Sequence, residues 1–123
     1  MIFGVGLDIV DVERVAQQLS RHAGLREQVY TADEISYCSG RPHAARHFAA
    51  RFAAKEAFLK ALGLGLGAGI GLNEIEVATA SGGPALRVHG SAATVLAQRG
   101  IRRTRLSLAC PARVASAIVI LEI

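Results

Sequence analysis

The pattern of apolar positions predicts both strands and helices along the chain. Residues 2–10 are apolar almost throughout and predict a buried strand, and residues 12–21 then follow a helical period. A longer amphipathic helix is predicted from about Phe48 to Leu62. Beyond it the pattern predicts a half-exposed hairpin over 75–88, a helix from Ser91 to Gly100 that Ser91 caps, and strands over 106–109 and 114–123.

Polar residues at the ends of these elements have a simple structural interpretation. Asp8 and Asp11 lie near the end of the first strand, and for either acid alone a helix cap or a turn is the simplest role. Thr31 and Glu34 have the spacing of a capping box, which predicts a short helix through Cys38.

The central helix contains a lysine in an unusual place. Lys55 falls within the apolar stripe, with Glu56 beside it and Lys60 one turn after Glu56. Burying an ammonium group costs several kcal/mol unless it is paired, so Lys55 either extends to solvent or meets an anion. The helix runs into glycines at 63, 65, 67, 69 and 71, and taken alone this stretch fits a surface helix with a Glu56–Lys60 pair and a flexible exit loop.

Length, composition and charge narrow the function. With 123 residues the chain is expected to form one domain, residues 1–123, with a modest core. No apolar run is long enough to span a membrane, no signal peptide is evident, and the two cysteines lack metal-site spacing, so a cytoplasmic protein with free thiols is expected. A net charge of +4 favours an anionic partner, such as a phosphorylated ligand, an acidic protein or nucleic acid.

Two segments together resemble a known family. The amino-terminal Gly4-Val-Gly-Leu-Asp-Ile-Val and the central Arg51-Phe-Ala-Ala-Lys-Glu-Ala-Phe-Leu-Lys-Ala-Leu-Gly are similar to those of the holo-[acyl-carrier-protein] synthases, the small 4′-phosphopantetheinyl transferases. The resemblance spans nearly the whole chain. It implies an α+β fold, with a long central helix packed on a small antiparallel sheet, and a homotrimer with sites between subunits.

The resemblance also implies an active site. Asp8 and Glu56 would hold Mg²⁺ together with waters and the diphosphate of coenzyme A, and Lys60 would contact the same phosphates. Glu56 is the leading candidate for the base, directly or through a metal-bound water. Further contacts to coenzyme A are expected from Lys55, Arg51, Gly63, Gly65 and Pro84.

The implied reaction is the transfer of phosphopantetheine to a serine of the apo carrier protein, which releases adenosine 3′,5′-bisphosphate. Arg14, Arg21 and Arg26 are expected to form a basic strip that docks the acidic helix of the carrier, and neither nucleic acid nor a membrane is expected as a partner. The chain departs from the family pattern at Leu64, at Cys110 and in the turn Gly82-Gly-Pro84. Two alternatives stay open: a non-catalytic relative that binds coenzyme A, and a basic module that binds nucleic acid.

Overall fold

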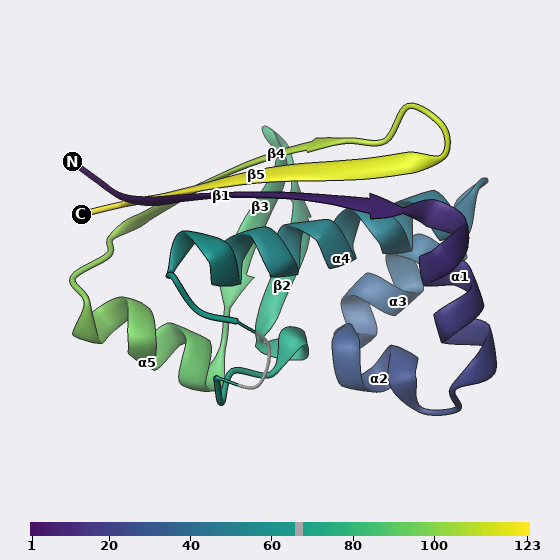
Figure 1. Cartoon of the computed structure of the whole chain (residues 1–123), viewed down its shortest axis with the longest axis horizontal. Helices are drawn as coiled ribbons and strands as arrows, with labels where there is room; N and C mark the ends of the chain where they lie inside the picture. The colour runs from purple at the N-terminus through teal and green to yellow at the C-terminus, as the bar shows by residue number, and fades with distance from the viewer. Residues whose placement is uncertain (66–67) are drawn as a thin grey trace.

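The computed structural model describes residues 1–65 and 68–123, and Gly67 of the glycine run lies outside them. After the first strand come four successive helices, then a hairpin, a fifth helix and two more strands (Figure 1). Its elements are β1 Ile2–Asp11, α1 Val12–Arg21, α2 Leu25–Val29, α3 Ala32–Ser39, α4 Ala44–Ala61, the 3₁₀ turn η1 Leu72–Glu74, β2 Ile75–Ala80, β3 Gly83–Val88, α5 Gly90–Gln98, β4 Arg103–Ala109 and β5 Val114–Glu122.

Two antiparallel sheets frame the central helix. The larger has the strand order β1-β5-β4, and the smaller is the β2–β3 hairpin. Helix α4 runs beneath the larger sheet, α1 to α3 gather at one end of α4, and α5 lies near the other end (Figure 1). The expected α+β architecture, with a long helix on a small antiparallel sheet, is confirmed.

Glycines in β1 allow the strand to lie against α4. Gly4 and Gly6 face the helix, and a Cβ atom at either position would overlap the carbonyl oxygen of Ala61 or Ala57, respectively. Two strand residues advance about 6.6 Å and four helix residues about 6 Å, so the two repeats stay matched along the contact. Asp8, two residues after Gly6, therefore continues the face of β1 that looks toward α4.

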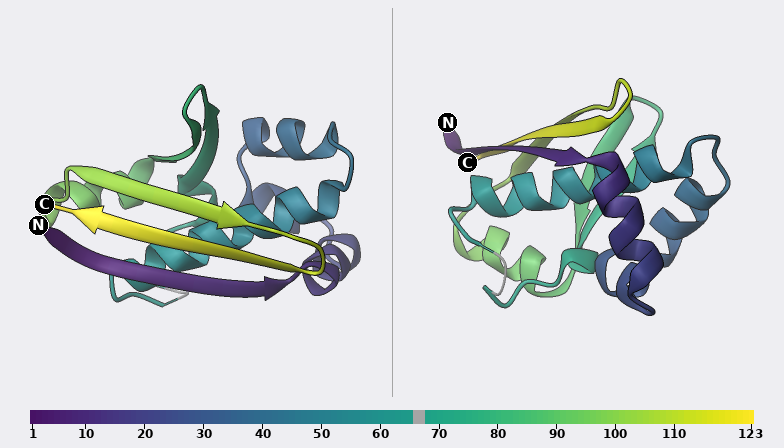
Figure 2. Two further views of the ribbon diagram at one scale, coloured as in Figure 1. Left: turned by 90° about the horizontal axis from the view of Figure 1, so that it is seen from above. Right: turned by 45° about the vertical axis from the view of Figure 1, so that its right-hand side comes forward.

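The expectation that residues 2–10 form a buried strand is wrong. The side chains that alternate with the glycines point away from α4, and Val5, Leu7 and Ile9 are 56%, 52% and 63% exposed. Among the described elements, none covers this outer side of the sheet, which faces the viewer in the left panel of Figure 2. The glycines lie on the inner face of β1 against α4, and the large apolar side chains lie on its outer face. An unbroken apolar run therefore does not mean that both faces of this strand are buried.

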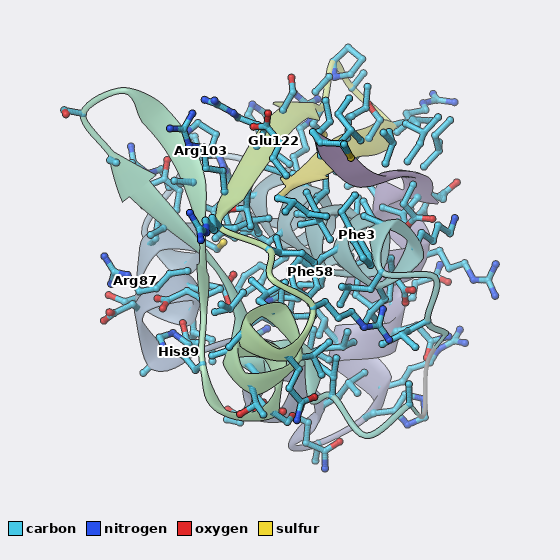
Figure 3. All side chains as sticks on the ribbon, turned by 90° about the vertical axis from the view of Figure 1, so that its left-hand side faces the viewer. Phe3, Phe58, Arg87, His89, Arg103 and Glu122 are labelled. Atoms are coloured by element: carbon cyan, nitrogen blue, oxygen red, sulfur yellow. The ribbon has the colours of Figure 1, made fainter. Side chains whose placement is uncertain are left out.

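Helix α4 is longer and more buried than its stripe predicts. It begins at Ala44 rather than near Phe48, because His43 adopts a left-handed conformation (φ 57°) that precedes the helix. Alanines let the sheet and the neighbouring helices approach α4 on several sides, and Phe58 is completely buried in the interior (Figure 3). The helix is thus surrounded by protein along most of its length.

Three smaller features of the structure also differ from the sequence prediction. Helix α2 is not predicted by the apolar pattern. The hairpin is less exposed than expected at its start, since Glu76 in β2 is only 4% exposed. Ser91 does not cap α5; instead the Glu74 carboxylate accepts hydrogen bonds from the backbone N–H and the hydroxyl of Ser91. Both cysteines are free thiols, as expected.

Candidate active site

Asp8, Glu56 and Lys60 come together between β1 and α4. The Lys60 ammonium donates to Asp8 Oδ1 at 2.8 Å and to the Leu7 carbonyl at 3.2 Å. Lys60 therefore pairs with Asp8 across the two elements instead of forming the expected pair with Glu56 along the helix. Asp8 neither caps a helix nor forms a turn, while Asp11 does cap α1 by accepting from the Arg14 N–H.

The pKa of Glu56 reflects both its burial and the charge of Asp8 nearby. Burial and the nearby Asp8 carboxylate raise the pKa of Glu56, and Lys60 opposes them. Two coupled carboxylates with one cationic partner suit a hard divalent cation, which would neutralise their repulsion and leave coordination positions for water and phosphate. In the described part of the chain, no group of three or more His, Cys, Asp and Glu side chains could hold a metal ion. The residues therefore fit Mg²⁺ only as a partial ligand set that the substrate completes.

Lys55 has a partner inside the protein. Its side chain is fully buried, and its ammonium donates to Glu34 at 2.7 Å and to the carbonyls of Leu72 and Ile75. An ammonium has three donors, so all three are used. Of the two alternatives for Lys55, extension to solvent or pairing with an anion, the structure shows the second. The anion is Glu34, and we therefore leave Lys55 out of the coenzyme A contacts.

Arg51 and Pro84 line one cavity of about 360 Å³, together with Arg46 and two histidines, His43 and His47. Burial and the adjacent Arg51 and Arg41 lower the pKa of His47, which indicates a positive potential. Arg51 is 4% exposed and lies over the Tyr37 ring, and its Nε finds no hydrogen-bond partner among the described residues. The cavity suits an anionic group.

The histidines and Arg46 in this cavity were not assigned a role from the sequence. His43 and His47 are one turn apart without a third ligand, and the pattern gave no reason to expect the hairpin residue Pro84 beside them. Cys110 also lines the cavity, and burial raises the pKa of its thiol. A neutral thiol supplies no charge there.

Gly63 ends α4 in a left-handed conformation (φ 75°). Its N–H donates to the Lys60 carbonyl, and the Leu64 N–H donates to the Leu59 carbonyl at 2.8 Å, as in a Schellman motif. Gly65 follows as an exposed residue. Gly63 therefore has a structural role in ending α4. The expected contacts of Gly63 and Gly65 with coenzyme A stay a prediction.

The basic residues expected to dock a partner divide into two groups. Arg14 and Arg21 are both exposed, and seven residues apart they share one side of α1. Arg26 is instead partly buried, with its guanidinium 5.1 Å from the centre of the Phe48 ring. We therefore limit the basic strip to Arg14 and Arg21. Arg14 also borders a mainly apolar cavity of about 470 Å³ between β1, α1, α2 and α4.

Comparison with known proteins identifies the family. The 4′-phosphopantetheinyl transferase superfamily profile matches residues 4–110. The chain belongs to this superfamily. It is 46% identical to a holo-[acyl-carrier-protein] synthase of Geobacter metallireducens over 99% of this chain and 98% of that protein.

Two crystal structures of holo-[acyl-carrier-protein] synthases agree with the fold of this phosphopantetheinyl transferase. The Neisseria meningitidis structure has a TM-score of 0.90 with 28% identity and covers all of both chains. The Bacillus anthracis structure, described as a complex with CoA (3′,5′-ADP), has a TM-score of 0.80 with 30% identity, covering 98% of this chain and 96% of that one. The predicted family and enzyme class, a holo-[acyl-carrier-protein] synthase, are confirmed.

One further property of this phosphopantetheinyl transferase concerns its helices. Among the described residues, no helix is both long enough and apolar enough to cross a membrane.

Proposed function

We propose that this chain, acting as one domain, transfers 4′-phosphopantetheine from coenzyme A to a serine of an apo acyl carrier protein in a Mg²⁺-dependent reaction. The serine oxygen forms a bond to the β-phosphorus, the bridging P–O bond breaks, and adenosine 3′,5′-bisphosphate leaves. The observation that carries the proposal is the meeting of Asp8 and Glu56 beside Lys60, in a chain that belongs to the transferase superfamily.

Each of the three side chains has a role in this proposal. Asp8 and Glu56 would hold Mg²⁺, which supplies charge neutralisation for the diphosphate when bound. The raised pKa of Glu56 suits a carboxylate that accepts the serine proton, since a base is more effective when its pKa lies nearer the working pH. Lys60 is 54% exposed, so its ammonium can leave Asp8 and reach a phosphate oxygen.

The cavity that contains Arg51 is the proposed site for another phosphate of coenzyme A. Its buried guanidinium has an unused Nε donor, and Arg46 adds a second positive charge. Helix α4 begins at this cavity with no side-chain cap among the described residues. The Arg46 N–H donates to the His43 carbonyl, which leaves the first two N–H groups of the helix for an anion. The hairpin residue Pro84 closes the other side.

These two regions lie on different sides of α4. Arg51 and Glu56 are five residues apart, which places their side chains about 140° apart around the helix. One coenzyme A molecule could reach both kinds of site most directly if the carboxylates came from one subunit and the basic cavity from its neighbour. This arrangement supports the proposed homotrimer with sites between subunits.

The exposed apolar face of β1 and β5 supplies the surface for such an assembly. Leu7 and Ile118 are paired across the two strands and are 52% and 43% exposed, and Val5 and Ile9 flank them. Monomeric proteins rarely leave a continuous apolar patch of this kind in water. We propose that copies of the chain pack together through this face.

The carrier protein would dock on the strip formed by Arg14 and Arg21. Both guanidinium groups are exposed on α1, and α1 follows directly from the strand that carries Asp8. A basic strip beside the carboxylates would orient an acidic carrier with its serine toward the proposed metal site. Arg14→Glu should therefore raise the KM for carrier more than that for coenzyme A, whereas Arg102→Glu, at an exposed position after α5, should change neither.

The transfer itself is tested by mass spectrometry. The protein is incubated with coenzyme A, Mg²⁺ and an apo carrier, and the carrier is expected to gain about 340 Da, the mass of the prosthetic group. EDTA should prevent the gain, and excess Mg²⁺ should restore it. A carrier of unchanged mass, with coenzyme A still bound by the protein, would instead identify a non-catalytic relative. A protein that binds nucleic acid, but neither modifies the carrier nor binds coenzyme A, would support the alternative of a basic nucleic-acid-binding module.

A further inference from the structure

The buried ammonium of Lys55 joins four elements at one point. It comes from α4 and donates to Glu34 of α3, to Leu72 of η1 and to Ile75 of β2. Burial lowers the pKa of Lys55, and the Glu34 carboxylate opposes that effect. The ammonium has no donor left for a substrate.

Glu34 is equally well satisfied. Its carboxylate accepts from Lys55, from the Thr31 N–H at 3.0 Å and from the Val77 N–H at 3.0 Å, and it is only 1% exposed. Removing two charges from water is expensive, and a well-packed apolar pair at such a place is often equally stable or more stable. Stability alone therefore does not explain the pair. Directional hydrogen bonds do fix how the elements are oriented.

The orientation of α4 determines where the Glu56 side chain points. Lys55 and Glu56 are consecutive, so their side chains point about 100° apart around α4. With Lys55 held toward α3 and β2, Glu56 lies on the same flank of α4 as Lys60, whose ammonium reaches Asp8 on β1 at 2.8 Å. A small rotation of α4 would move the Glu56 carboxylate away from Asp8.

The same ammonium also holds the segment that follows α4. Leu72, whose carbonyl accepts from Lys55 at 3.1 Å, comes after the glycine run and lines the 470 Å³ cavity beside Ile9 and Val10. Those two residues directly follow Asp8 in β1. Lys55 thus connects the helix of Glu56 with the far end of the glycine-containing segment.

We propose that Lys55, through its buried ion pair with Glu34, is a positioning residue that holds Glu56 opposite Asp8. This inference rests on the proposed function of the two carboxylates. Lys55 contacts neither substrate nor metal, and its effect passes through the orientation of α4.

The test uses the full chain with Lys55→Met combined with Glu34→Met, which replaces the ion pair by apolar side chains and leaves no unpaired buried charge. Glu34→Gln, which keeps the shape, is the second variant. Val119→Ala, in the core of β5, controls for a simple loss of stability. Thermal unfolding, Mn²⁺ affinity by electron paramagnetic resonance in the presence of coenzyme A, and kcat and KM are measured for each protein.

If Lys55 positions Glu56, the double variant should fold, bind Mn²⁺ about 10- to 100-fold more weakly and lose kcat by a similar factor, as for other groups that orient metal ligands. Glu34→Gln should move in the same direction. Val119→Ala should lose stability but keep its Mn²⁺ affinity.

Unchanged Mn²⁺ affinity and kcat in a folded Glu34→Gln or double variant would overturn the inference. A higher KM for coenzyme A at unchanged kcat and Mn²⁺ affinity would also overturn it, because it would make Lys55 a substrate contact. Wild-type protein that neither binds Mn²⁺ nor modifies the carrier would refute the proposed function instead.

Discussion

At the scale of single residues, Glu56 illustrates a conflict between folding and activity. Burial and Asp8 raise its pKa, so ionised Glu56 makes the fold less stable. This cost is absent below the ordinary glutamate pKa and grows as the pH rises through the raised value. We predict that Glu56→Gln lowers turnover by about 10²- to 10⁴-fold. We also predict that, without metal, it is more stable than the wild type at neutral pH.

The prediction for Glu56 is checked by thermal unfolding in EDTA across the acidic to neutral range, together with the mass assay. The melting temperatures of wild type and Glu56→Gln should converge at low pH and separate at neutral pH. Equal turnover, or a variant that is less stable at neutral pH, would contradict the assignment.

Glu76 behaves in the opposite way. Burial acts to raise its pKa, but hydrogen bonds from His89 and Thr31 outweigh burial and lower it. Its ionised form therefore stabilises the fold above the ordinary glutamate pKa, and this contribution is lost as the pH falls through the lowered value. Figure 3 shows the partner, His89, at the surface beside Arg87.

We predict that His89→Ala raises the pKa of Glu76 and moves acid unfolding to higher pH. Circular dichroism during an acid titration measures the shift. His22→Ala, which removes another exposed histidine, is the matched control. An acid-unfolding midpoint equal to that of the control would show that the 2.7 Å contact between His89 and Glu76 contributes nothing to stability.

Sequence could identify these residues more easily than their partners. Lys55 stood out because a charge fell within an apolar stripe, yet nothing in the pattern pointed to Glu34, 21 residues earlier. Lys60 was expected beside Glu56 because both lie on one helix, but its ion pair is with Asp8 on β1. Local spacing reports neighbours within an element and not those across elements.

At the scale of elements, the contact between β1 and α4 decides where Asp8 lies. Gly6→Ala would place a methyl group against the Ala57 carbonyl and push the strand away from the helix. We predict a loss of about 1–3 kcal/mol in the free energy of unfolding, as for other overpacked sites, with a fall in turnover because Asp8 moves from Glu56.

Denaturant unfolding and the mass assay test this prediction. Gly82→Ala is the control, because a Cβ there would meet none of the described atoms within 4 Å and its φ is not in the left-handed range. It should leave both properties unchanged. A fully stable and active Gly6→Ala protein would mean that the strand and helix tolerate a wider separation.

The same contact explains why one element was predicted only in part. An unbroken apolar run usually indicates a strand buried on both faces, but in β1 the glycines meet α4 and the large side chains face outward. The helix α1 was easier, since it has a clear apolar period and is capped by Asp11. Helix α2, with only five residues, is too short for such a period.

At the scale of the whole molecule, the resemblance gave the fold, while the basic cavity appeared only in three dimensions. The cavity combines the start of α4, the hairpin residue Pro84 and Cys110 after β4, which are far apart in sequence. Charge alone favoured an anionic partner without locating it. The fold turns that general preference into a specific surface.

The exposed apolar face of β1 and β5 is the proposed contact between subunits, so a charge placed on it should prevent assembly. Leu7→Lys or Ile118→Lys would place an ammonium in the proposed interface. Every subunit would then bury an unpaired charge on assembly. We predict that either change prevents the proposed trimer from forming, so that the chain stays monomeric and transfer is abolished. The monomer should keep its fold, since both side chains point away from the core.

Light scattering after size-exclusion chromatography gives the mass of each protein, and circular dichroism reports its fold. Gln17→Lys, which adds the same charge at an exposed position of α1, should remain trimeric and active.

The decisive experiment mixes two inactive variants, Glu56→Gln and Arg51→Gln, after mild dissociation and reassociation. If Glu56 of one subunit works with Arg51 of its neighbour, mixed trimers contain some sites with both native residues and regain part of the activity. No recovery in mixed trimers would place both residues in the same subunit's site.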